Sequence, residues 1–129
     1  MIAHDIRSIL SNLPVLTITA NTTEKEADAA FPQLASVNEG GVFVGQFSGQ
    51  TPWERHSTGD ELLHVLDGEM EITVLTTDGP VRVTVRAGSI FVVPRGLWHR
   101  QLAAKKVTEL SVTPQPSDIS FAEDPRRES

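Results

Sequence analysis

The fold of this chain is decided by two stretches of its sequence, G-Q-T-P-W-E-R-H-S-T-G-D-E-L-L-H-V-L-D-G at residues 49–68 and G-S-I-F-V-V-P-R-G-L-W-H at residues 88–99. Each stretch places a histidine at the edge of a run of strand-forming residues, and the first adds a glutamate five residues after its histidine. His56, Glu61 and His99 therefore form a set of two histidines and one carboxylate. Such a set is typical of transition-metal sites.

The region around these stretches is a succession of short strand-forming runs, which begins at Gly41 and is punctuated by glycine, proline or aspartate. The predicted strands span residues 41–47, 61–66, 69–76, 81–86, 89–93, 99–103 and 107–112. The third and fourth of these runs alternate apolar with polar side chains, and Asp78-Gly79 between them is typical of a hairpin turn. This rhythm predicts an all-β domain, an antiparallel sandwich or barrel.

The two quoted stretches resemble the two sequence motifs of the cupin family. The second stretch fits G-x5-P-x-G-x2-H at every fixed position, through Gly88, Pro94, Gly96 and His99. The chain is therefore identified as a small single-domain cupin of the RmlC-like, cupin 2 type, with the resemblance covering about residues 41–112. The resemblance implies a double-stranded β-helix, or jelly-roll, barrel with a metal site and a small-molecule site inside it.

The first stretch resembles the other cupin motif, G-x5-H-x-H-x3-4-E-x6-G. With Glu61 on its glutamate and Gly68 on its closing glycine, His56 takes the second histidine position and Glu54 the first. The resemblance thus implies a metal site made of Glu54, His56, Glu61 and His99. A divalent cation would satisfy buried carboxylates and imidazoles together. Any one of these residues taken alone is better explained as a polar residue of a surface loop, and it is their joint occurrence in two spaced motifs that favours metal or ligand binding.

Glu54 has three possible roles: fourth metal ligand, general base beside the metal, or ion-pair partner of Arg55 or Arg95. As a ligand it completes a set of two nitrogens and two oxygens, which suits iron, manganese, nickel or zinc. Without it, the other three residues have the composition of the facial triad of non-haem iron, which leaves coordination positions open for substrate and oxygen. Sulfur ligands and thiolate catalysis are excluded because the chain has no cysteine.

The ends of the chain are expected to lie outside the barrel, so that residues 1–14 form a flanking helix, 15–112 the barrel and 113–129 a loosely held tail. The helix is predicted from apolar residues at spacings of three and four, with Pro14 ending the pattern. These residues are Ile2, Ile6, Ile9, Leu10 and Leu13. Residues 15–19 are rich in strand formers, and 21–30 could be a loop or a short helix.

Composition restricts the partners. The 129 residues carry a net charge of −6 and contain no Lys/Arg cluster that could neutralise successive phosphates, so we expect no nucleic-acid partner. No stretch approaches the ~20 apolar residues of a membrane helix, so we expect no membrane partner and a cytoplasmic location. A homodimer is predicted because small cupins often pair through exposed sheets and because short, flat strands need their edges covered.

Three functions are compatible with these observations. The first is a metal-binding cupin with a small-molecule ligand or substrate inside the barrel; its reaction and catalytic residues are not identified from the sequence. The second is a non-catalytic ligand-binding or sensor cupin. The third is a metal-free structural or interaction domain. Metal content separates the third from the others, and turnover of candidate substrates separates the first from the second.

Overall fold

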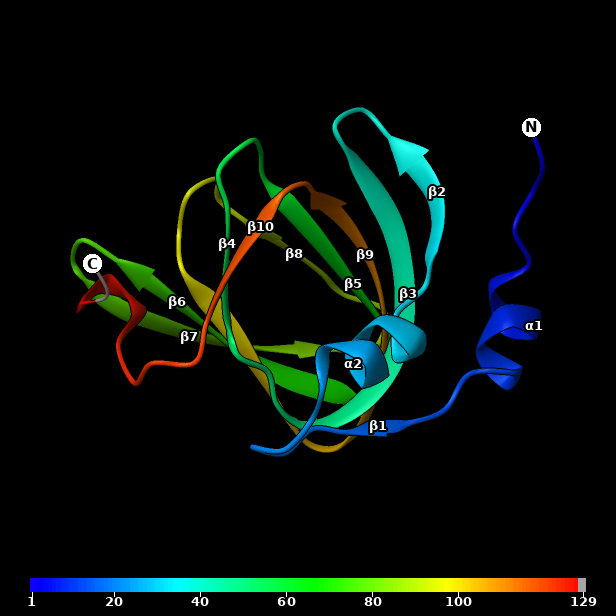
Figure 1. Cartoon of the computed structure of the whole chain (residues 1–129), viewed down its shortest axis with the longest axis horizontal. Helices are drawn as coiled ribbons and strands as arrows, with labels where there is room; N and C mark the ends of the chain where they lie inside the picture. The colour runs from blue at the N-terminus through cyan, green and yellow to red at the C-terminus, as the bar shows by residue number, and fades with distance from the viewer. Residues whose placement is uncertain (128–129) are drawn as a thin grey trace.

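The computed structural model describes residues 1–127, in which the strands curl into a barrel (Figure 1). The strands are β1 (Leu16–Thr17), β2 (Gln33–Val37), β3 (Gly40–Gln50), β4 (Trp53–His56), β5 (Glu61–Asp67), β6 (Glu69–Thr76), β7 (Gly79–Arg86), β8 (Ile90–Val93), β9 (His99–Pro114) and β10 (Ser117–Ser120). Two helices, α1 (Ile6–Ser11) and α2 (Glu24–Ala30), precede most of the strands, and a 3-10 turn, η1 (Pro125–Arg127), follows them. The predicted all-β jelly-roll architecture is confirmed.

Strand β9 organises the barrel because it pairs antiparallel with four other strands. Its first part pairs with β6 and meets β4, its later part pairs with β5, and β3 pairs with it on both sides of a register shift between Phe47 and Gly49. The sequence predicted two strands, at 99–103 and 107–112, where the structure has one. The two predicted strands form one continuous strand because a strand can bend at a register shift and still pair with different neighbours before and after the bend.

The core follows the alternation seen in the sequence. Met70, Ile72 and Val74 on β6 are at most 4% exposed and belong to the main apolar cluster. On β7, however, Val81 and Val83 are 46% and 36% exposed, although they alternate just as regularly. Val85, on the same face of β7, is only 3% exposed and belongs to the main cluster, so the core covers one end of this strand and leaves the hairpin end open. The predicted hairpin between the two strands is confirmed.

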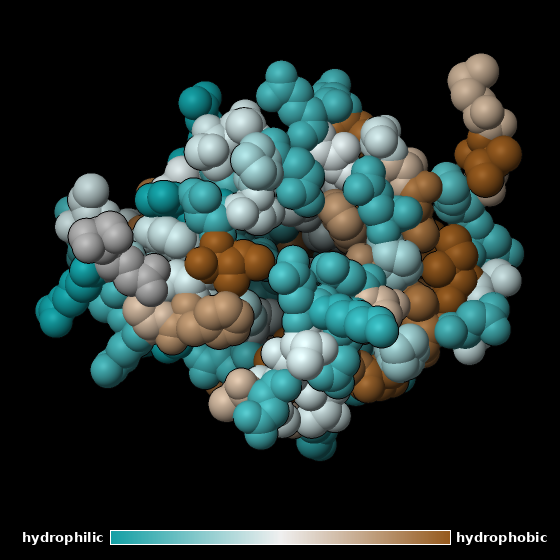
Figure 2. Space-filling model, viewed as in Figure 1, coloured by the Kyte–Doolittle hydropathy of each residue, from teal (hydrophilic) through white to brown (hydrophobic). Residues whose placement is uncertain are grey.

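The N-terminal helix is shorter than the periodicity predicted. Helix α1 begins after Asp5, whose side chain accepts a hydrogen bond from the Ser8 backbone N–H at 3.0 Å, and it ends at Ser11. None of its residues is buried, and the Gln46 side chain of β3 ties it to the barrel by donating to the Leu10 carbonyl at 3.2 Å. Helix α1 thus lies outside the barrel, at the right of the view, where brown apolar surface gathers (Figures 1 and 2).

Helix α2 lies within residues 21–30, for which the sequence was compatible with either a loop or a short helix. It begins with a capping box, in which Thr23 accepts from the Glu26 backbone and Glu26 accepts from the Thr23 backbone. The residue after it, Phe31, packs directly on Gly45 of β3, where any β-carbon would collide with the phenyl ring. This close approach holds α2 against the barrel opening (Figure 1).

The prediction of a loosely held tail is wrong for residues 117–120. These residues form β10, which pairs antiparallel with β4 and brings Ser117 opposite His56 and Ile119 opposite Glu54. An ion pair of 2.9 Å between Arg55 and Asp118 reinforces the pairing. The composition of the tail did not indicate strand β10, because β10 is held by hydrogen bonds to the edge of β4 and not by burial of apolar side chains. Among residues 1–127, no helix is long and apolar enough to cross a membrane.

Candidate metal centre

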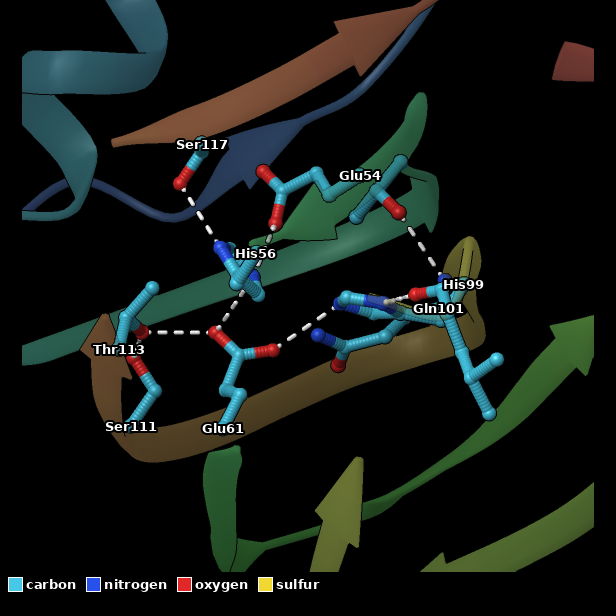
Figure 3. Close-up of polar contacts among 10 residues, drawn as sticks. Glu54, His56, Glu61, His99, Gln101, Ser111, Thr113 and Ser117 are labelled. Carbon is cyan, nitrogen blue, oxygen red and sulfur yellow. Dashed lines mark hydrogen bonds and ion pairs between the residues drawn. The ribbon is translucent and has the colours of Figure 1, made fainter. Parts of the chain in front are cut away.

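The structure brings all four predicted site residues together inside the barrel (Figure 3). One ligand atom from each of Glu54, His56, Glu61 and His99 lies within 4.8 Å of the others. Strand β4 supplies Glu54 and His56, which are two residues apart and so share a face, while Glu61 begins β5 and His99 begins β9. The strand register places Glu54 directly opposite His99.

The Glu61 carboxylate is the centre of this cluster. Its Oε1 lies 3.1 Å from His99 Nε2, and its Oε2 lies 3.4 Å from His56 Nε2. Thr113, at the far end of β9, donates a hydrogen bond from its hydroxyl to Oε2 at 2.7 Å. The carboxylate is therefore oriented from outside the cluster while both of its oxygens face the imidazoles.

Each imidazole is oriented through its other nitrogen. His99 Nδ1 donates to the Leu97 carbonyl at 3.0 Å, and Nε2 donates to Glu61 Oε1 at 3.1 Å in the protonated ring, so that loss of this proton leaves an Nε2 lone pair facing the cluster. His56 Nδ1 lies 3.0 Å from the Ser117 hydroxyl, and with a proton on Nδ1 this ring also turns an Nε2 lone pair into the cluster. His56 Nε2 is buried and has no hydrogen-bond partner. Metal-binding histidines are typically held in this way, with one ring nitrogen fixed by a neighbour and the other turned toward the metal.

Glu54 lies at the open side of the cluster. Its carboxylate is 3.8 Å from His56 Nε2, and its side chain is 36% exposed, whereas the other three residues are almost fully buried. An ion pair with Arg55 or Arg95, the third role considered for Glu54, is not formed among the described residues: Arg55 pairs with Asp118, and Arg95 donates to the Ser57 carbonyl at 2.7 Å. The geometry therefore leaves the roles of ligand and of base for Glu54.

The charges in the cluster favour a cation. Burial alone would raise the pKa of Glu61, but the neighbouring imidazoles outweigh burial and lower that pKa to about 2. Burial also opposes a charged His99, yet the contact with Glu61 raises the pKa of His99 above its ordinary value. Desolvation and then the Glu61 charge raise the pKa of Glu54. A divalent cation would offset the repulsion between the two carboxylates and would give His56 Nε2 a partner, so the residues fit a metal.

A cavity of about 890 Å³ adjoins the cluster. Much of its wall is apolar or aromatic and comes from the strands and from the end of α2, including Phe31, Phe43, Phe47, Trp53 and Leu63. Glu54, Glu61 and His99 border the same cavity. A small molecule in the cavity would therefore contact a metal held by these residues.

Four polar residues of the site were not identified from the sequence: Gln101, Glu109, Thr113 and Ser117. Gln101 lies two residues after His99, so the period of a strand could have placed it on the same face. Glu109 and Thr113 fall on the inward face of the later part of β9, where polar residues interrupt an apolar run. No local sequence pattern points to Ser117 as a site residue, because it reaches the site only through the pairing of β10 with β4.

Sequence comparison finds relatives in plants and bacteria. The germin-like protein subfamily 2 member 4 of Arabidopsis thaliana is 29% identical over 110 residues, which cover 81% of this chain and 46% of that protein. The uncharacterized protein YdbB of Bacillus subtilis (strain 168) is 26% identical over 110 residues, which cover 85% of this chain and 92% of YdbB. The chain thus spans about half the length of the germin-like relative and nearly all of YdbB.

The comparison with solved structures shows the same fold. Protein NMB1881 from Neisseria meningitidis matches with a TM-score of 0.66 and 16% identity, over 88% of this chain and 99% of that one. The family model described as the cupin domain matches residues 43–112, a range that contains all four residues of the cluster. On the strength of this match over more than half of its length, together with its barrel fold, the chain belongs to the cupin family.

Proposed function

We propose that this cupin binds a divalent transition metal through Glu54, His56, Glu61 and His99, and that its cavity holds a small molecule against that metal. One observation carries the proposal: two buried imidazoles and one buried carboxylate meet in a single cluster in which His56 Nε2 has no hydrogen-bond partner. Burying such groups without a partner is unfavourable, and a cation removes the cost. Iron, manganese, nickel and zinc all suit ligands of this kind.

The side chains of the cluster have separate tasks in this proposal. His56, His99 and Glu61 hold the metal, while Ser117, Leu97 and Thr113 keep their ligand atoms in place. A bound metal of this class supplies Lewis-acid or redox chemistry. Glu54, which borders the cavity, either completes the ligand set or accepts a proton from the small molecule. Enzyme and ligand-binding protein are both consistent with this arrangement, and turnover of candidate substrates separates them.

Metal analysis of purified variants tests the proposal. The protein should be purified without chelator or nickel resin, loaded with each candidate metal, freed of excess metal and analysed by mass spectrometry. We expect wild type to retain metal and His56→Ala and Glu61→Ala to lose it. His64→Ala is the matched control, because His64 faces away from the cluster on β5 and its loss should leave the metal content unchanged.

Two results would contradict the proposal. The first is a wild-type protein that retains none of the four metals. The second is equal metal content in wild type, His56→Ala and Glu61→Ala, with all three shown to be folded by circular dichroism. Native mass spectrometry on the same samples would identify a co-purified small molecule directly.

A further inference from the structure

The cavity contains a second polar group that the metal proposal does not use. Within residues 1–127, three buried side-chain atoms have no hydrogen-bond partner: His56 Nε2, Gln101 Oε1 and Glu109 Oε2. The first belongs to the metal cluster. The other two belong to residues that line the cavity and are only 8% and 6% exposed. Unsatisfied polar atoms of this kind are rare in folded proteins and call for a partner.

Gln101 and Glu109 come together because β9 bends. Gln101 lies in the first part of the strand, on the face of His99, and Figure 3 shows its side chain extending toward the cluster. Glu109 lies in the later part, which pairs with β5 and β3. The Gln101 amide faces the Glu109 carboxyl across the cavity wall, so the two unpartnered oxygens belong to one polar patch.

The patch is uncharged under ordinary conditions. Burial, followed by the charge of Glu61, raises the pKa of Glu109 to about 8. At neutral pH Glu109 is therefore mainly a carboxylic acid, which can both donate and accept a hydrogen bond. Gln101 Oε1 is an acceptor that needs a donor. A hydroxyl group has both properties, whereas a carboxylate has no proton to donate to Gln101 and would lie close to the charge of Glu61.

We infer that Gln101 and Glu109 form a subsite for a hydroxyl group of an uncharged small molecule, whose apolar body packs on the aromatic wall of the cavity. The wall supplies Phe31, Phe43, Phe47 and Trp53 for that body. The inference rests on the proposed function in taking the cavity as the ligand site, but it requires no metal. The molecule would thus be selected at two places, by the metal cluster and by this neutral patch.

Phenol and toluene are suitable probes because they match in size and differ in one hydroxyl group. Their dissociation constants should be measured by NMR titration of the full chain, treated with chelator and, separately, loaded with metal. We expect phenol to bind chelator-treated wild type several-fold more tightly than toluene. One neutral hydrogen bond is worth up to about tenfold in affinity, and we expect Gln101→Leu and Glu109→Leu each to weaken phenol binding by about that factor while toluene binding is retained.

Two further variants separate hydrogen bonding from a general effect on folding. Glu109→Gln keeps a donor and an acceptor in the same volume, so phenol should bind it nearly as tightly as wild type. Glu71→Leu makes the same kind of change as Glu109→Leu on the outward face of β6 and should leave both probes unaffected. Melting temperatures of Gln101→Leu and Glu109→Leu should be measured on the same samples, because each substitution also removes the contact between the Gln101 amide and the Glu109 carboxyl and leaves the other group without it.

The inference is overturned if wild type binds phenol no better than toluene, or if the ratio of the two affinities is the same in wild type, Gln101→Leu and Glu109→Leu. Water alone would then satisfy the two oxygens. Metal content measured on the same samples keeps the two proposals apart. If wild type binds no metal, the proposed function is wrong. The ratio of phenol to toluene affinity in chelator-treated protein still tests the subsite in full.

Discussion

Replacing Glu109 with glutamine should stabilise the protein, by an amount that grows with pH. The ordinary pKa of a glutamic acid is 4.5, and burial with the Glu61 charge raises that of Glu109 to about 8. Between these values the folded protein holds a proton that the unfolded chain has released, so the free energy of unfolding falls as pH rises. The contribution of Glu109 is therefore fully present below pH 4.5 and is lost as pH rises through 8. A glutamine side chain does not titrate in this pH range, so the variant lacks this dependence on pH.

The size of the effect follows from the two pKa values. Each pH unit between them is worth about 1.4 kcal/mol, so the full difference of about 3.5 pH units amounts to roughly 5 kcal/mol. Between pH 4.5 and pH 7 the unfolding free energy of wild type falls by roughly 3 kcal/mol for this reason. The measured quantity is the unfolding free energy of Glu109→Gln minus that of wild type. We expect this difference to be larger at pH 7 than near pH 4.5 by about that amount.

Urea denaturation of both proteins at a series of pH values between about 4.5 and 8 measures this difference. Chelator-treated samples are required, because a bound cation would offset the charge of Glu61 and shift the titration of Glu109. Glu71→Gln, on the outward face of β6, gives the effect of the same substitution outside the cavity. A difference between wild type and Glu109→Gln that stays constant across this range would refute the reasoning, because it would mean that Glu109 gains or loses no proton on folding.

Four other outcomes are expected. Glu54→His should raise and Glu54→Ala lower the affinity for nickel or zinc in calorimetric titrations, because imidazole suits these ions better than a carboxylate does; equal affinities in both variants and wild type would exclude Glu54 as a ligand. Ser117→Ala should weaken metal binding by about 10–100-fold in the same assay, since it frees the His56 ring; unchanged affinity would mean that this contact does not orient the ring. Gly45→Ala should lower the unfolding free energy by about 1–3 kcal/mol, because the added methyl group collides with Phe31; thermal denaturation measures this, and a variant as stable as wild type would show that Phe31 is not packed on Gly45. The homodimer stays a prediction, which light scattering would confirm by the mass of two chains and contradict by the mass of one.

Local sequence patterns were sufficient for much of the barrel. Alternation in residues 69–76 and the turn at Asp78-Gly79 predicted the β6–β7 hairpin, because side-chain period and turn chemistry are properties of neighbouring residues. The same reasoning did not show that Val81 and Val83 would be exposed, since exposure depends on whether another strand covers that face. It also placed the start of the first helix too early, because the capping residue Asp5 limits the helix more strongly than apolar spacing does.

The sequence by itself determined the residue types of the candidate metal centre and the strand pattern that brings them near one another: Glu54 and His56 share a face by their spacing, and two motifs place Glu61 and His99 at strand starts. Only the tertiary structure decided which neighbours orient these ligands and what else faces the cavity. Ser117 reaches His56 because β10 pairs with β4, and Glu109 joins Gln101 because β9 bends. Such contacts join residues far apart in the chain, and their partners are set by the pairing of strands, which no local pattern contains.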